Sequence, residues 1–170
     1  MGIDRRTALG LIGIVATGSI GFAQKKALSG NSAEERAVAP KILERLKEAP
    51  HTVDSLAKLF PGVKPQVLSG ALELLVDDDT VDTWTLRKGG VSWYMESDAL
   101  NDTSEKIKSA TPEAGQRLSA ITKALPTLKP DGVRSLVQYL VDDGDLRYVG
   151  DGSDNDPLVT KVTKPRRAEG

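Results

Sequence analysis

The sequence predicts a mostly α-helical α+β protein with small β-hairpins, built from two repeats related by a 65-residue shift and preceded by an N-terminal apolar helix. Two observations predict this class. Residues 41–81 and 106–146 share 12 identities over 41 positions, where ordinary composition gives roughly two or three by chance. Within the first repeat, apolar residues at helical spacing give way to alternation typical of a hairpin. We interpret the pattern as an internal duplication.

The first repeat is expected to contain three helices and a hairpin, at residues 34–47, 53–60, 65–76, 80–86 and 91–95. Val38, Ile42 and Leu46 recur at helical spacing and define a buried face of the first helix. Thr52 is a suitable cap for the second helix, and Pro65 suits the first turn of the third. Pairing of the last two segments buries one face of each strand.

The second repeat is expected to follow the same order, at residues 101–110, 117–125, 130–141, 146–149 and 158–162. Its first helix is predicted to be short or degenerate, because Ile107 is the only large aliphatic side chain in a polar run. A long acidic loop over residues 150–157 joins the two expected strands.

Three helices followed by a two-stranded hairpin resemble the winged helix-turn-helix. In the first repeat the resemblance rests on residues 54–60, the turn Pro61-Gly62, the helix 65–76 and the hairpin 81–95. The pair resembles tandem winged-helix protein-interaction modules, for instance the tandem winged-helix subunit of bacterial chromosome-condensing complexes, over residues 34–162. The N-terminal apolar segment is not part of that family's pattern, so the resemblance implies the architecture and not that family's specific function.

The domain organisation follows from these patterns: a membrane anchor or signal at 1–26, a linker at 27–33, winged-helix-like domains at 34–97 and 98–162, and a basic tail at 163–170. Residues 7–24 carry no charge and lie between paired basic residues, and 18 residues are near the lower limit for crossing a membrane. We therefore expect a membrane-associated protein with a single N-terminal span. The alternatives are export after cleavage near Ala23, since the segment partly resembles a twin-arginine signal, and a buried helix of a soluble protein.

Composition argues against catalytic, cofactor and metal sites. The 170 residues include no Cys and one His, which excludes disulfides and thiolate metal sites and leaves little material for zinc or Ser-His chemistry. The acidic segment from Asp151 resembles a calcium loop but has Asp156 where glycine belongs and Val162 where glutamate belongs. We predict no catalytic residues, no cofactor, no metal and no enzymatic activity.

Charge distribution bears on the partner. Residues 34–97 carry eight basic and eleven acidic side chains, and residues 98–160 carry seven and eleven. The expected exposed stripes of the third helices are Gln66, Ser69, Gly70, Glu73 and Asp77, and then Asp131, Arg134, Ser135, Gln138 and Asp142. Such acidic faces disfavour phosphate. The possible nucleic-acid contacts are Arg87, Lys88, Arg134, Gln138, Lys161, Lys164, Arg166 and Arg167.

These observations favour a non-enzymatic, membrane-attached interaction or structural protein that uses tandem winged-helix domains to bind another macromolecule. We expect a protein partner, with membrane contact through residues 7–24, in a membrane-associated assembly or a virion. The alternative is a membrane-tethered or soluble DNA-binding transcriptional regulator.

Overall fold

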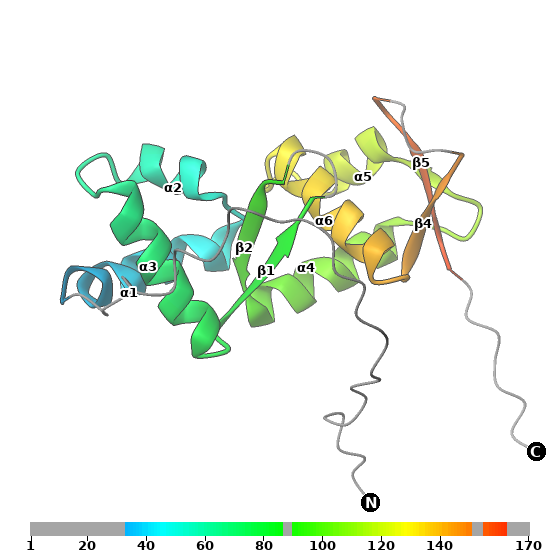
Figure 1. Ribbon diagram of the computed structural model, residues 1–170. Coiled ribbons are helices and arrows are strands. Elements are labelled where there is room, and N and C mark those ends of the chain that lie inside the picture. The colour runs from blue at the N-terminus through cyan, green and yellow to red at the C-terminus, as the bar shows by residue number, and fades with distance from the viewer. Residues whose placement is uncertain (1–32, 87–89, 151–154, 163–170) are drawn as a thin grey trace, which may run out of the picture. The chain divides into compact units, whose positions relative to one another are not determined.

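The computed structural model describes residues 33–86, 90–150 and 155–162 (Figure 1). The elements are α1 (Ala33–Glu48), α2 (Val53–Leu59), α3 (Pro65–Asp77), β1 (Val81–Thr85), β2 (Ser92–Glu96), α4 (Ser97–Ala110), β3 (Gln116–Arg117), α5 (Leu118–Ala124), α6 (Pro130–Asp142), β4 (Leu146–Val149) and β5 (Leu158–Lys161). The predicted α+β class, with helices and small antiparallel strand pairs, is confirmed.

The order helix, helix, helix, hairpin occurs twice along the chain, with a short extended segment before the second helix of each set. In the first set that segment is His51, which forms a bridge to Tyr94 on β2. In the second it is β3, which pairs with β5, so that the sheet order is β3-β5-β4. Each hairpin therefore gains a third, very short strand on the same side.

The third helices begin and end in the same way. Both α3 and α6 have 13 residues and start with proline at the first helical position, where a missing N–H is tolerated. After α3, Asp79 has a φ of 54°, and the equivalent position after α6 is Gly144, with a φ of 83°. This left-handed residue turns the chain out of the helix, so that Thr80 and Asp145 donate back to the carbonyls of Leu75 and Leu140.

The predicted cap of α2 is present. The Thr52 side chain accepts from the Ser55 N–H at 3.1 Å, and the Ser55 hydroxyl oxygen accepts from the Thr52 N–H at 2.9 Å. This reciprocal pair is a capping box, and it satisfies donors that the helix itself leaves unpaired.

Helix α4 is longer than the sequence predicted. It begins at Ser97, directly after β2, and the Glu96 carboxylate accepts from the Ala99 N–H at 2.7 Å. Its buried face combines two aliphatic and two small polar residues: Leu100, Thr103, Ser104 and Ile107. The expectation of a short helix failed because half of this face is polar in sequence yet buried in the structure.

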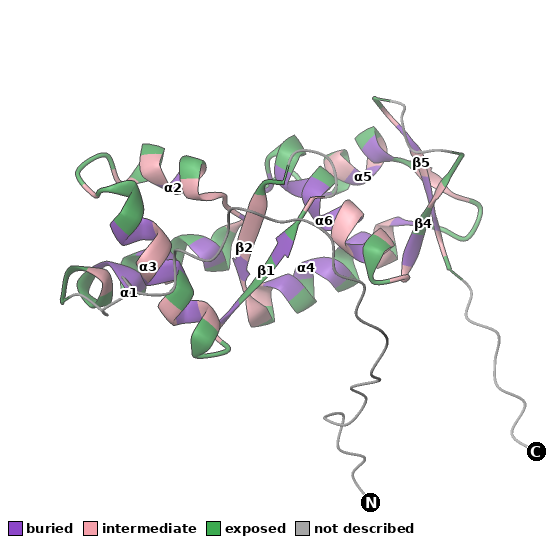
Figure 2. Cartoon of the chain, in the orientation of Figure 1, coloured by how far each residue is buried: buried purple, intermediate pink, exposed green. Residues whose placement is uncertain are grey.

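The described residues form two hydrophobic cores, and the first hairpin contributes to both (Figure 2). Val81 of β1 lies in the core formed by α1, α2 and α3. Trp84 and Met95, from β1 and β2, lie in the core formed mainly by α4, α5 and α6. The Trp84 ring lies 5.5 Å from the Tyr139 ring of α6, centroid to centroid. The first hairpin therefore packs against both sets of helices and connects them.

The sequence predicted a membrane-associated protein with a single N-terminal span, or export as the alternative. This predicted localisation is wrong. Across residues 33–86, 90–150 and 155–162, no helix combines the length and apolarity that crossing a membrane requires. The apolar segment 7–24 and the helix predicted there lie outside the described residues.

Candidate macromolecule-binding surfaces

The exposed side of α6 does not present its polar side chains freely. Arg134 Nη2 donates to the backbone carbonyl of Asn155 at 2.6 Å. Gln138 donates to the Asp142 carboxylate at 3.2 Å and accepts from the Tyr148 hydroxyl at 3.3 Å. The groups that were predicted to contact base edges are thus engaged within the protein.

Two small residues that were predicted to be exposed on the third helices are partly or fully buried. Ser135 is inaccessible to solvent, and its hydroxyl donates to the Gly132 carbonyl at 2.8 Å. Gly70, the equivalent position in α3, is half-buried, and a Cβ there would lie 2.6 Å from the Glu35 carboxyl group of α1. Placing these residues on exposed stripes was wrong, because small side chains also mark positions where neighbouring groups approach the helix closely.

The end of the second wing, which is the loop that joins β4 to β5, is held against α5 and α6. The Asp156 carboxylate accepts from the Ser119 N–H at 2.7 Å and from the Ser119 hydroxyl at 2.8 Å, and Arg117 donates to the Asp156 carbonyl at 2.8 Å. The backbone and then the side-chain hydrogen bonds of Ser119 lower the pKa of Asp156, with a smaller effect from Arg117. These hydrogen bonds and the contact from Arg134 hold Asn155 and Asp156 beside α6, the helix that was predicted to bind nucleic acid.

The exposed side of α3 is open but acidic. Gln66, Glu73 and Asp77 are exposed, and α3 contains no Lys or Arg. Exposed Asp78 and Asp79 follow at the C-terminal end, where the helix dipole is already negative. This face therefore carries a negative field that repels phosphate and attracts cationic groups.

The remaining predicted nucleic-acid contacts lie at the end of β5 or outside the described residues. Arg87, Lys88, Lys164, Arg166 and Arg167 lie outside the described residues. Lys161 is half-buried at the end of β5, opposite Leu146 of β4.

His51 lies where the two sets of helices meet. It is half-buried, its backbone N–H donates to Tyr94 at 2.9 Å, and its Nδ1 lies 3.0 Å from the Ser55 hydroxyl. Burial is the main cause that lowers the pKa of His51, followed by the positive charge of Lys129. The sequence gave no sign of the strand contact between His51 and Tyr94.

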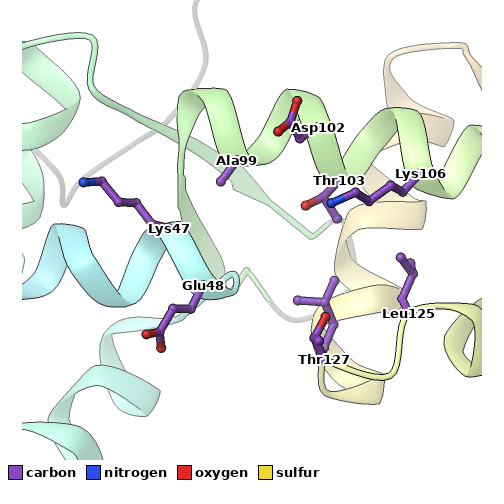
Figure 3. Close-up of a pocket in the computed structure, with 9 residues that line it drawn as sticks. Lys47, Glu48, Ala99, Asp102, Thr103, Lys106, Leu125 and Thr127 are labelled. Carbon is purple, nitrogen blue, oxygen red and sulfur yellow. The ribbon is translucent and has the colours of Figure 1, made fainter.

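A cavity of about 160 Å³ lies between the end of α1, one side of α4 and the turn from α5 to α6 (Figure 3). Thr103 contributes a buried wall, and Leu125 and Leu128 contribute apolar surface. Sequence reasoning missed this cavity because its walls come from three separate segments that only tertiary packing brings together.

Within the described residues, no three or more His, Asp or Glu side chains are grouped as a metal site would require. The paired carboxylates at Asp77-Asp78 and Asp142-Asp143 lie at the ends of α3 and α6. They are exposed, so water solvates them.

The arrangement of helices, hairpins and third short strands defines a winged-helix-like fold, as the sequence resemblance implied. One similar solved structure is the mRNA-binding domain of elongation factor SelB from E. coli, determined in complex with SECIS RNA. The match has a TM-score of 0.54 and 17% sequence identity, and it covers 76% of this chain and 99% of that one. At this identity the similarity shows the fold alone. No protein-family model and no curated protein matches the chain.

Proposed function

We propose that this chain is a non-enzymatic interaction protein whose two winged-helix-like repeats bind another macromolecule, and that this partner is a protein. The proposal rests on the exposed faces of α3 and α6, the two helices that would contact nucleic acid. The α3 face is acidic, and on α6 the Arg134 guanidinium is held by the wing carbonyl of Asn155. Because phosphate neutralisation supplies most non-specific nucleic-acid affinity, neither face suits DNA or RNA.

An exposed leucine at the end of α2, the helix that precedes α3, supports a protein partner. Leu59, at the end of α2, is 46% exposed, and Phe60 and Val63 in the following turn are half-buried. Exposed aliphatic surface next to charged groups occurs in many protein interfaces. The second and third helices of the first repeat are therefore the surface on which we place the partner.

RNA is the second candidate partner, because the structurally similar SelB domain was determined in complex with RNA. The two ends of the chain are also basic, at +3 for residues 1–33 and +3 for residues 161–170. Under this alternative, the basic ends supply the affinity and the folded repeats contribute shape.

Site-specific photo-crosslinking tests the proposal. The full chain carries a photoreactive amino acid in place of Gln66 on α3 or, as a matched control, in place of exposed Arg147 on β4. Each version is crosslinked in an extract of the native source, with and without nuclease treatment. We expect a protein adduct from position 66 that resists nuclease and is weakened by Leu59→Ser. An adduct that nuclease removes, or equal adducts from both positions, would contradict the proposal.

A further inference from the structure

One side of the first hairpin packs on the second set of helices. Trp84 of β1 and Trp93 of β2 lie directly opposite each other on this side, and Met95 lies two positions further along β2. All three side chains contact the core formed mainly by α4, α5 and α6, and the Trp84 ring contacts Tyr139 of α6. We call this the outer side of the hairpin, since it faces away from the helices that precede the hairpin in its own repeat.

The outer side of the second hairpin has apolar residues at the same positions, but they are more exposed. The 65-residue shift maps Trp84 onto Val149 of β4 and Trp93 onto Leu158 of β5, and these two residues are again directly paired. Val149 is 51% exposed. Leu158 is half-buried and belongs to neither hydrophobic core of the described residues. The second hairpin therefore exposes the apolar position that the first hairpin buries against the next repeat.

Further along the second hairpin, the outer side is covered in the middle and open at the end. Thr160, on the same side as Leu158, is 4% exposed, and its hydroxyl donates to the Glu113 carbonyl at 2.7 Å. Val162 continues the alternation, since its N–H donates to the Asp145 carbonyl at 3.0 Å, and it is 37% exposed. Two exposed valines, at positions 149 and 162, thus lie on one side of one hairpin.

The surface that covers the first hairpin has a counterpart on α3. Tyr139, which receives Trp84, is equivalent by the same shift to Leu74 in the C-terminal half of α3. Leu74 is half-buried and belongs to neither core of the described residues. It therefore offers an accessible apolar contact at the position where α6 receives the outer side of a hairpin.

The charges beside these two positions are complementary. Within one chain, burial is the main cause that raises the pKa of Tyr139, followed by the nearby negative charges of Asp143 and Asp82. The shift maps Asp82 onto Arg147 of β4 and Asp143 onto Asp78 at the end of α3, and both of these residues are exposed. If the second hairpin packed on α3 as the first packs on α6, Arg147 would lie beside Asp78. Opposite charges would then replace the two like charges of the contact within the chain.

We propose that the outer side of the second hairpin, around Val149, binds the C-terminal half of α3, around Leu74, in a second copy of this chain. The two surfaces are different, so copies join head to tail and each assembly keeps one free surface of each kind. Gln66 lies about two turns before Leu74 on α3, and Leu59 lies on α2. The contact between copies is therefore separate from the end of α3 on which we place the protein partner, and either assignment can fail alone.

Sedimentation equilibrium of the full chain over a range of concentrations provides the test. We expect the average mass to rise beyond that of a dimer, with a Kd on the order of 0.1 mM, because a contact between one hairpin and one helix is small. Val149→Asp and Leu74→Asp should each weaken association about tenfold or more, since each places a charge in an apolar contact. Each variant keeps the surface that the other has lost, so their equimolar mixture should form a complex that stops at two chains.

A charge reversal and a control complete the test. Arg147→Glu should weaken association, and adding Asp78→Lys to the same chain should restore it. Leu59→Ser, at an aliphatic residue that is 46% exposed, should leave association unchanged while it weakens the protein adduct from position 66. Amide spectra verify that each variant is folded.

Three results would overturn the proposal. The first is a parent chain that stays monomeric at concentrations about tenfold above that Kd. The second is association that Val149→Asp and Leu74→Asp leave unchanged, or that their mixture fails to regain. The third is a photoreactive residue at position 149 that crosslinks to a different protein and not to a second copy.

Discussion

Trp84→Ala is expected to destabilise the second set of helices, although Trp84 belongs to the first hairpin. The Trp84 side chain is 8% exposed and contacts the Tyr139 ring, in the core that contains α4, α5 and α6. Truncating a buried Phe or Trp to alanine typically costs about 3–5 kcal/mol. The Trp84 indole N–H has no partner among the described residues, and removing an unsatisfied buried donor recovers about 1–3 kcal/mol. We therefore expect a net loss of about 2 kcal/mol, the middle of a range of about 0–4 kcal/mol.

Urea unfolding and hydrogen exchange measure this effect. Unfolding should remain a single transition at lower urea, and the amides of α6 should lose protection together with those of α1. Trp84→Phe, which replaces the indole with a smaller aromatic ring and removes the N–H, should cost less than the alanine variant. Asp82→Ala, an exposed position on the same strand, serves as the control. Unchanged protection of α6 in Trp84→Ala, or two separate transitions, would refute the shared core.

The remaining predictions concern equivalent core positions and two titrating groups. Leu75→Ala and Leu140→Ala should each lower the free energy of unfolding by about 2–5 kcal/mol, since the leucines are 7% and 2% exposed; a loss below that range at either site in urea titrations counts against the 65-residue register. Because the His51 pKa is lowered on folding, its contribution to stability is present above the ordinary value of about 6.5 and is lost as pH falls below it. Thermal melts between about pH 7.5 and about pH 5.5 should show less pH dependence in His51→Gln, and equal dependence would contradict the assignment. Because the pKa of Asp156 is lowered on folding, the carboxylate stabilises the fold at pH values above its ordinary pKa of 3.8, and this stabilisation is lost as pH falls through the lowered value. The Asp156 carboxyl should titrate by NMR below pH 3.8, and Ser119→Ala should move that midpoint upward.

The elements that the sequence predicted well are those encoded by local signals. Lys-Pro pairs at 64–65 and 129–130 placed the starts of α3 and α6, because proline suits the first turn of a helix. Apolar spacing placed Leu75 and Leu140 in the cores. The start of α4 was missed because its capping residue is Glu96, at the end of a strand, and its buried face includes Thr103 and Ser104.

The candidate site was harder to predict because its decisive contacts are remote in sequence. Arg134 and Gln138 stand one helical turn apart, and a sequence alone shows them as available to a base. The wing residues Asn155 and Asp156 return to α6 and α5 only in the folded protein, where they engage Arg134 and Ser119. The cavity around Thr103 has the same origin, since its walls converge from α1, α4 and the α5–α6 turn.

Binding of short labelled RNA and DNA to the full chain, measured by fluorescence anisotropy at low and physiological salt, tests the proposed function most directly. The variants are Arg134→Ala and a deletion of residues 163–170, which leaves β5 intact. We predict that any binding disappears at physiological salt, is abolished by the deletion and is unchanged by Arg134→Ala. Binding that survives the deletion, with Arg134→Ala costing roughly 1–3 kcal/mol and relaxing sequence preference, would contradict the account and identify a nucleic-acid-binding protein.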